Sequence, residues 1–414
     1  MQKFPYQEGI PLNTKNRNIA SFILGFCIML FAGVFYAWSL FRVELQGRFP
    51  EWSASAASLN LSFFIITFCL GGLLGGRLTA KLGQPKVARL GALLMLAGGL
   101  LFLTLSRVGA SAALILLYLS YGGLCGLGVG MVYNADISAV SSLFPKTGGL
   151  VSGALLTGFG LGSLIMGAIV MKLAEGIGFF PAFFCSVLLV AAVSFFGAPL
   201  LTPAERKAEA GAPAASGGRE LTSGEMLKTP VFWLFFLWVI FMTSGGLMVI
   251  NSAASIALLF GAAAIVGMIV SVFNGLSRTF IGAFCDRFGS SASMLLSTGA
   301  AILSGLFLLA ATFTGSTVLM VLGLVSTGVT YGCAMSMNAV VVREQFGGRN
   351  YPSNFSVATL SGIPSSIIGP YVSGMLQDAS GGGYTTTFVA MIVFSLIAAG
   401  CLCGILVIRK REKA

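Results

Sequence analysis

Twelve long apolar segments limit what this chain can fold into. Each has about the 20 largely apolar residues that a helix needs to cross the hydrocarbon core of a bilayer. The segments cover residues 18–41, 56–78, 87–105, 112–135, 148–171, 180–200, 230–253, 262–284, 292–313, 317–341, 353–376 and 386–408. They are too long, and alternate too little, to be barrel strands of about ten residues. Because backbone polar groups must pair internally in lipid, the sequence predicts an all-α membrane protein with twelve transmembrane helices.

The composition excludes several other classes of protein. Only 9% of the residues are charged and the mean hydropathy is +0.94, whereas a soluble globular chain carries about 25% charged residues. We therefore expect neither a soluble enzyme nor a nucleic-acid-binding module. The chain has no histidine, and its eight cysteines all lie in or beside apolar segments, where they act as small apolar side chains. We expect no catalytic residue, no metal and no cofactor.

Polar stretches divide the apolar segments into two sets of six. We expect an N-terminal tail at 1–17, which is too polar for a signal peptide, a first bundle at 18–200, a linker at 201–229, a second bundle at 230–408 and a C-terminal tail at 409–414. Each half has a short basic loop bounded by glycine after its second helix, GGRLTAKLG (Gly75–Gly83) and IGAFCDRFG (Ile281–Gly289). This weak repeat indicates two pseudo-symmetric six-helix bundles.

The positive charges are distributed unevenly between the two sides of this topology. With the N-terminus in the cytoplasm, 19 of the 24 Lys and Arg residues fall on the cytoplasmic side. Only four fall outside: Arg42, Arg48, Arg107 and Lys172. Because cations accumulate on the cytoplasmic side of membrane proteins, we expect a multi-pass protein of the cytoplasmic membrane with both termini inside, and we expect it to be a monomer.

The remaining cation, Arg278, is the only one that this topology assigns to neither side of the membrane. It lies eight residues before Asp286, which at 1.5 Å per residue is about 12 Å into the membrane. No acidic residue is expected at that depth, because Asp136, Asp286 and Glu344 lie near helix ends. The alternatives are a snorkelling arginine or structural ion pair, and an arginine that binds an anion in a central cavity. A guanidinium suits a carboxylate, and Asn274, one turn earlier, could orient either partner.

Polar and aromatic side chains within other apolar segments form a second group of candidates. We expect the substrate-binding set to be Arg278, Asn274, Tyr331, Tyr36, Tyr121, Asn251 and Ser361. The alternative for such tyrosines is core packing or an interfacial belt, in which the ring is buried and the hydroxyl finds a partner. The two basic loops supply an expected gating motif of Gly76, Gly83, Asp286, Arg287 and Gly289.

Several strings resemble one branch of transporters across nearly the whole chain. They are GVFYAWSLF, VGMVY followed by LFPKTGGLVSGALLTGFGLG, SGEMLKTPVFW, NGLSRTFIGAFCDRFG and FGGRNYPSNF. In order and spacing they resemble the bacterial oxalate/formate antiporter and monocarboxylate transporter branch of the major facilitator superfamily. The resemblance implies that fold, with Arg278 binding the substrate carboxylate and Tyr36 and Tyr331 lining the cavity.

Departures from this pattern bear on the substrate. The resemblance implies a second cation, a lysine, eight residues after Asn350 in oxalate transporters, but this chain has Ala358 there. One cation matches a monoanion and only half neutralises a dianion, so we expect a small monocarboxylate such as lactate, pyruvate or acetate. The first basic loop has Ala80 where the superfamily usually places Asp. Asn274 stands where animal monocarboxylate carriers place Asp, so proton coupling does not carry over directly.

These observations predict a secondary active transporter rather than an enzyme. We expect a small carboxylate anion to cross the membrane by alternating access, with protons as the coupling ion. Anion exchange of the oxalate/formate type is the alternative, since it needs no protonatable carrier. A membrane receptor that does not transport is a more remote alternative, and no soluble signalling domain is seen to support it.

Overall fold

The computed structural model describes residues 14–144, 148–202, 220–347 and 350–413. Within these ranges the chain is helical and contains no β-strand. The first half consists of α1 (Thr14–Ala32), η1 (Gly33–Ala37), α2 (Trp38–Arg48), α3 (Ala54–Leu82), α4 (Gln84–Leu103), η2 (Thr104–Arg107), α5 (Ala110–Leu117), η3 (Tyr118–Cys125), α6 (Gly126–Ser142), α7 (Gly148–Ile177), α8 (Phe179–Gly197) and η4 (Ala198–Leu201). The second half consists of α9 (Ser223–Met226), α10 (Pro230–Ile250), α11 (Ala253–Leu259), η5 (Ala264–Met268), α12 (Ile269–Thr314), α13 (Thr317–Phe346), α14 (Tyr351–Thr359), α15 (Gly362–Ala379) and α16 (Thr385–Lys413).

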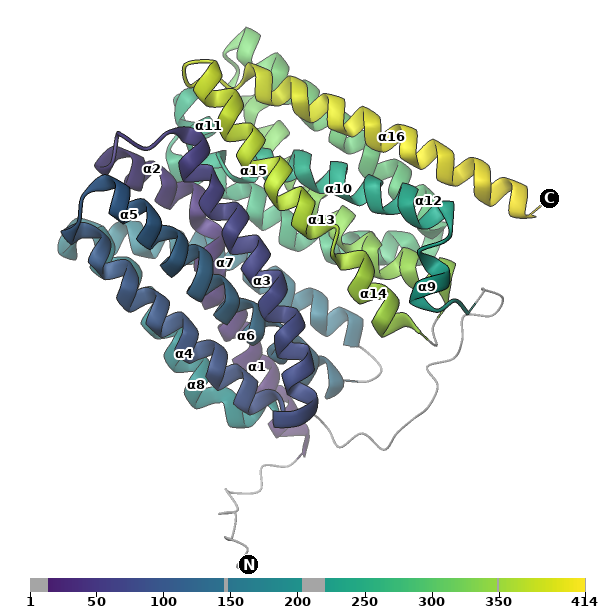
Figure 1. The fold of residues 1–414 in the computed structure, drawn as a ribbon, viewed down its shortest axis with the longest axis horizontal. Helices are drawn as coiled ribbons and strands as arrows, with labels where there is room; N and C mark the ends of the chain where they lie inside the picture. Colours follow the sequence, from purple (N-terminus) through teal and green to yellow (C-terminus); the bar gives the residue numbers. More distant parts are fainter. Residues whose placement is uncertain (1–13, 145–147, 203–219, 348–349, 414) are drawn as a thin grey trace, which may run out of the picture.

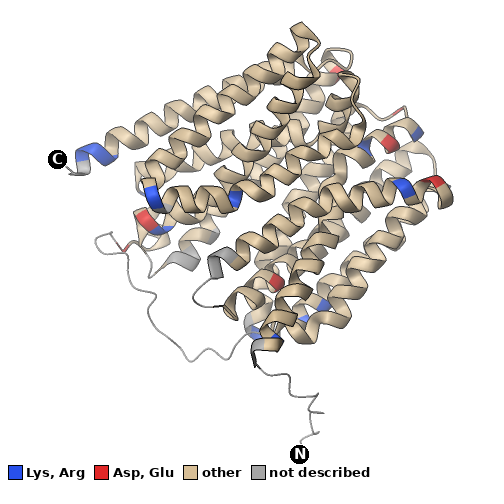
Figure 2. Ribbon diagram, turned by 180° about the vertical axis from the view of Figure 1, so that it is seen from behind, with Lys and Arg blue, Asp and Glu red and all other residues tan. Residues whose placement is uncertain are grey.

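The helices of the two halves lie side by side as two groups (Figure 1). Between the groups, α3 packs against α15 and α7 packs against α12. We call the end at which α1 begins and α16 ends the terminal face, and the end that carries the α2–α3 connection the far face. Charged residues gather toward the helix ends, as the blue and red segments of Figure 2 show, and leave long apolar stretches between the two faces. The expected boundaries of the two bundles stay a prediction, and most of the expected linker lies outside the described residues.

Eleven helices among the described residues are long and apolar enough to span a membrane. The remaining expected segment, 353–376, is divided between α14 and α15, with a break at Leu360 and Ser361. Pro364 explains the break, because proline lacks an N–H group and its ring would clash with the carbonyl of Leu360 in a continuous helix. The predicted all-helical fold is confirmed, with this one spanning segment built from two shorter helices.

The two glycine-bounded loops have the same backbone geometry. Gly83 ends α3 with φ 79° and ψ 157°, and Gly289 interrupts α12 with φ 82° and ψ 166°. Side chains other than hydrogen rarely fit this region. The matching conformations give the weak sequence repeat a structural counterpart, since each half turns at its second helix through a glycine of the same kind.

Candidate functional site

Arg278 lies half-buried on α12, facing the first half of the protein. Its Nη1 donates a hydrogen bond to the hydroxyl of Tyr133 on α6, at 3.5 Å. No acidic side chain in the described part of the chain forms an ion pair with it. The guanidinium is therefore held by a neutral hydroxyl and keeps its positive charge uncompensated, which is costly at this depth unless an anion is bound.

Three tyrosines from different elements surround this guanidinium. Tyr36 of η1, Tyr133 of α6 and Tyr331 of α13 all lie within electrostatic reach of Arg278. The hydroxyls of Tyr36 and Tyr331 also interact with each other, so the group joins both halves. Three hydroxyls beside one cation offer donors to a bound carboxylate without adding charge.

Local packing fixes where these rings lie. The ring of Tyr36 meets Phe159 edge-on at 4.9 Å between centroids, and Tyr133 meets the same Phe159 at 5.6 Å. On the other side, Tyr331 is only 2% exposed because α10 comes close at Gly246, where a Cβ would lie 2.8 Å from the tyrosine ring. The tyrosines are thus wedged against neighbouring helices with their hydroxyls directed to one place.

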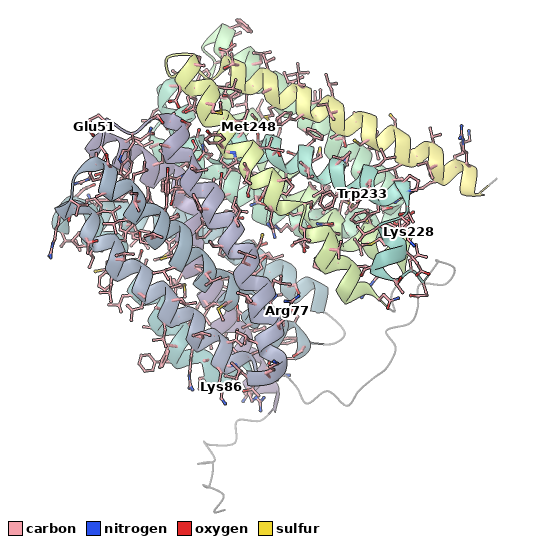
Figure 3. The ribbon with its side chains drawn as sticks, in the orientation of Figure 1. Glu51, Arg77, Lys86, Lys228, Trp233 and Met248 are labelled. Atoms are coloured by element: carbon pink, nitrogen blue, oxygen red, sulfur yellow. The ribbon has the colours of Figure 1, made fainter. Side chains whose placement is uncertain are left out.

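A cleft of about 520 Å³ lies between the two halves, on the side of the terminal face. Helices α3 and α6 line it from the first half and α14 and α15 from the second. Its lining residues are Phe68, Cys69, Leu70, Gly72, Leu73, Gly76, Arg77, Tyr133, Asn134, Phe355, Thr359, Leu360 and Ile363. Arg77 lies near the end of α3 (Figure 3), and Tyr133 connects the cleft to Arg278. A small anion can therefore approach the guanidinium from the terminal face.

Asn274 lies on α12 one turn before Arg278, where α12 meets α13. It is 3% exposed, and its Oδ1 has no hydrogen-bond partner among the described residues. The two helices approach each other closely here, since a Cβ at Gly332 would lie 2.3 Å from the backbone oxygen of Asn274. Its unsatisfied oxygen leaves the amide available to orient a neighbour.

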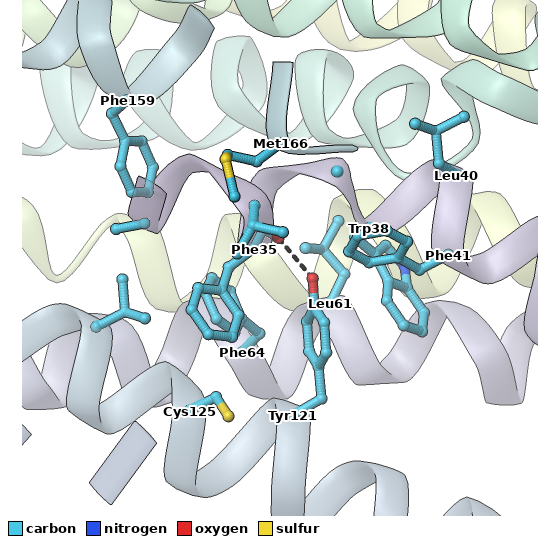
Figure 4. Packing of buried hydrophobic residues seen from close by; sticks show 14 of the residues in the cluster. Phe35, Trp38, Leu40, Phe41, Leu61, Phe64, Tyr121, Cys125, Phe159 and Met166 are labelled. Atoms are coloured by element: carbon cyan, nitrogen blue, oxygen red, sulfur yellow. Dashed lines mark hydrogen bonds between the residues drawn. The ribbon is translucent and has the colours of Figure 1, made fainter. Parts of the chain in front are cut away.

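Tyr121 is placed away from this group, in the aromatic core of the first half. It is fully buried, and its hydroxyl donates to the Phe35 carbonyl at 2.6 Å (Figure 4). Its ring stacks on Phe183 with centroids 5.5 Å apart. The hydroxyl is thus satisfied by the backbone, and the structure does not bring Tyr121 together with Arg278.

Asn251 also lies elsewhere, in a polar network that joins the halves at the far face. Its Oδ1 accepts from Trp38 Nε1 at 3.2 Å, and its Nδ2 donates to Ser58 Oγ at 2.8 Å. Arg42 is the centre of this network: it donates to Ser252 Oγ at 2.7 Å and to Gln377 Oε1 at 3.0 Å. The expectation that Arg42 lies in an external connection is wrong, because α2 continues to Arg48 and leaves Arg42 1% exposed.

A second contact closes the far face beside this network. The carboxylate of Asp378 at the end of α15 accepts from the backbone N–H groups of Ala54 and Ser55, at 2.7 and 2.9 Å. It thereby caps the N-terminus of α3 from the other half. Partial burial acts to raise the pKa of Asp378, but the hydrogen bonds from Ser55 and Ala54, together with nearby Arg42, outweigh it and hold that pKa below its ordinary value.

The remaining predicted residues lie at helix breaks and ends. Ser361 occupies the break between α14 and α15, where its hydroxyl donates to the Ala358 carbonyl at 2.8 Å. Gly76 lines the cleft, and Gly83 and Gly289 make the two turns described above. Arg287 is exposed and lies over the ring of Phe288 at 5.3 Å. Asp286 is on α12, and its side chain lies outside the described set.

Two functional candidates were missed by the sequence reasoning. Tyr133 was one of several helical tyrosines, and only the fold shows that it is the one bonded to Arg278. Asp136 was expected near a helix end, and it lies six residues before the end of α6, but it is 0% exposed, a burial that the sequence did not indicate. Both lie on α6, three residues apart. No group of three or more potential metal ligands occurs among the residues described.

Comparison with known proteins gives the same picture. The family model of the Major Facilitator Superfamily matches residues 18–273 and 240–414. The oxalate:formate antiporter of Oxalobacter formigenes is 27% identical over 383 residues, which cover 89% of this chain and 86% of the antiporter. Monocarboxylate transporter 13 of Rattus norvegicus is 28% identical over 382 residues, which cover 89% of this chain and 84% of that protein.

Solved structures share the fold at lower identity. The inward-open xylose transporter from E. coli has a TM-score of 0.71 at 12% identity, covering 94% of this chain and 96% of that one. A bacterial homologue of the human lysosomal transporter Spinster has a TM-score of 0.69 at 14% identity, covering 94% and 97%. The resemblance stated from the sequence strings is thus confirmed. With the family model matching nearly all of the chain, this protein belongs to the major facilitator superfamily of membrane transporters.

Proposed function

We propose that this protein carries a small monocarboxylate, of the lactate, pyruvate or acetate type, across the cytoplasmic membrane. The observation that supports this most directly is the single uncompensated guanidinium of Arg278, with three tyrosine hydroxyls around it. One positive charge matches one carboxylate. Ala358, where oxalate transporters place a lysine, is 1% exposed and brings no second cation.

The cleft and the far-face network support an alternating-access mechanism for this transport. The halves are held together at the far face through Arg42 and Asp378, and a cleft lies between them toward the terminal face. With Arg42 buried, the distribution of 19 cations against Arg48, Arg107 and Lys172 favours a cytoplasmic terminal face. In the proposed cycle, the anion binds Arg278, the Tyr36–Tyr331 contact between the halves adjusts around it, and the halves rock to expose the site on the other side.

The test is a pair of arginine variants in reconstituted vesicles. Arg278→Gln should abolish uptake of labelled lactate or pyruvate and the thermal stabilisation that these anions give to the purified protein, because the amide removes the only charge that pairs with the carboxylate. Arg77→Gln removes a cation from the cleft wall and is the matched control, with transport largely retained. Normal anion binding by folded Arg278→Gln would contradict the proposal.

Anion exchange is a second candidate, favoured by the similarity to the oxalate:formate antiporter. An exchanger takes up labelled anion only when the vesicles contain a counter-anion. A proton-coupled carrier takes it up into empty vesicles when the outside is acidic. A thermal-shift series of mono- and dicarboxylates separates the substrates, and stabilisation by oxalate but not by lactate or acetate would overturn the argument from Ala358.

A further inference from the structure

Asp136 is a carboxylic acid buried without any partner. It lies on α6, six residues before the helix ends at Ser142. Its exposure is 0%, and neither of its carboxylate oxygens has a hydrogen-bond partner among the described residues. Buried polar groups are nearly always hydrogen-bonded, so a carboxyl with two free oxygens calls for an explanation.

The surroundings of Asp136 offer no compensating charge. Its carboxyl abuts α1 at Gly25, where a Cβ would lie 2.6 Å from Oδ1. Helices α1, α3, α4 and α7 pack against α6, and no described charged or titratable side chain on them interacts with Asp136 electrostatically. Their cations toward the terminal face are exposed or engaged elsewhere: Arg17, Arg77, Lys81 and Lys86 are exposed, and Arg89 lies over Phe195. Lys172 and Glu175 pair with each other near the far end of α7. The neutral titratable groups on α1, α3 and α6 are Cys27, Cys69 and Tyr133.

The burial decides the protonation state in this conformation. An ionised carboxylate without a partner is far more costly to bury than a neutral acid. Asp136 is therefore protonated while α1 covers it. To release the proton, the contact at Gly25 must open enough to admit water, so the charge of Asp136 depends on how α1 and α6 are arranged.

The same helix links Asp136 to the anion site. Tyr133, whose hydroxyl accepts the hydrogen bond from Arg278, lies three residues earlier on α6. Residues three apart lie on neighbouring positions of one helix face. A change at Arg278 that moves Tyr133 therefore also moves Asp136, because the two residues are less than one turn apart on α6.

We propose that Asp136 is the group that binds the proton transported with the anion. This inference rests on the proposed monocarboxylate transport. With the anion on Arg278 and the proton on Asp136, their charges sum to zero; with both released, Arg278 and ionised Asp136 again sum to zero. States with only one ligand carry an uncompensated charge inside the membrane, which is costly. Each ligand therefore favours binding of the other, and one proton crosses with each monoanion.

The test separates exchange from net transport in vesicles containing Asp136→Asn. Exchange of labelled for unlabelled lactate moves no net proton, so it should continue at a rate near that of the wild type. An inward gradient of one pH unit allows a one-to-one carrier to accumulate substrate about tenfold. The variant should lose this accumulation and the lactate-dependent acidification reported by an internal pH dye. Glu175→Gln, which makes the same change at an exposed carboxyl of α7 outside the cleft, is the control and should keep both.

Three results would be decisive against part or all of this scheme. Accumulation and acidification that persist in Asp136→Asn overturn the role of Asp136. If the wild-type protein shows no lactate exchange, the proposed function is overturned instead. If neither Asp136→Asn nor Asp136→Ala folds, the wild-type protein can be treated with an apolar carbodiimide, which modifies protonated carboxyls. Asp136 should then be modified near neutral pH. Mass spectrometry that shows Asp136 unmodified there would refute its buried protonated state.

Discussion

At the scale of single residues, the proposed function depends on which tyrosines direct a hydroxyl toward Arg278. Tyr331 and Tyr121 are both almost completely buried, and the sequence suggested the same role for both. The structure separates them by the partner of the hydroxyl. Tyr331 interacts with Tyr36 beside the guanidinium, whereas Tyr121 donates to the backbone of Phe35. Burial alone therefore does not indicate whether a helical tyrosine faces the anion site, whereas the hydrogen-bond partner of its hydroxyl does.

This difference gives a prediction with a built-in comparison. Tyr331→Phe keeps the ring against α10 but removes a hydroxyl from the anion site, so the affinity for lactate should fall by about 1 kcal/mol, or about fivefold, with little change in thermal stability. Tyr121→Phe should do the reverse, lowering thermal stability because the Phe35 carbonyl loses its donor, while the affinity stays unchanged. Isothermal titration and thermal unfolding of both variants measure the two effects. Equal loss of affinity in the two variants would contradict this assignment.

Sequence reasoning put Arg278 inside a helix, where α12 has it, but did not predict the burial of Arg42 or of Asp136, and the reason is the same for both. Helix ends read from hydropathy are accurate to only a few residues. Arg278 lies far enough from any end for this not to matter. Arg42 falls one residue beyond the expected end of its helix and was assigned to a connection. Asp136 falls one residue beyond the expected end of its own helix and was placed only near that end. Whether such a residue is exposed depends on which neighbouring helix covers it, and that is decided by the fold.

At the scale of helices, the spanning segments were predicted well, but the break between α14 and α15 was not. Hydropathy reports how long a segment is, but the break between α14 and α15 depends on where Pro364 falls in the helix. The turn at Gly289 lies in the glycine-bounded loop expected at Ile281–Gly289, although hydropathy does not detect its backbone conformation. The conformation of Gly289 matches that of Gly83, so in both halves a glycine with the same backbone geometry reverses the chain between the second and third helices.

The conformation of Gly289 predicts a cost for any side chain there. With φ 82° and ψ 166°, Gly289→Ala should destabilise the protein by about 1–3 kcal/mol, although the site itself has open space around it. Gly299→Ala is the control, because Gly299 is helical, exposed and also in open space, so alanine there should be neutral or stabilising by up to about 1 kcal/mol. Unfolding of the purified variants in detergent measures both. Equal stability of the two alanine variants would exclude strain at Gly289.

At the scale of the whole molecule, two features oppose each other across the membrane. At the far face a buried arginine, a buried amide and a carboxylate cap hold the halves together. Toward the terminal face the same halves are separated by the cleft that leads to Arg278. Because a transporter must close one side before it opens the other, the far-face network sets how readily the opposite conformation forms. Its strength should therefore control the balance between the two states.

Arg42→Gln tests this directly. The shorter neutral side chain loses the bonds to Ser252 and Gln377 that cross between the halves, so the far face should open more often. Spin labels at Ser106 and Thr314, exposed positions of opposite halves near that face, should show a larger long-distance population by double electron–electron resonance in a background lacking native cysteines. Arg48→Gln is the control, since Arg48 is also on α2 but pairs with Glu44 of the same helix and lies over the ring of Phe180 in the same half. A distance distribution in Arg42→Gln that matches this control would mean that the network does not hold the far face closed. If the balance shifts as expected, lactate added to Arg42→Gln should meet a site open to the far face, and binding there should no longer depend on access through the cleft.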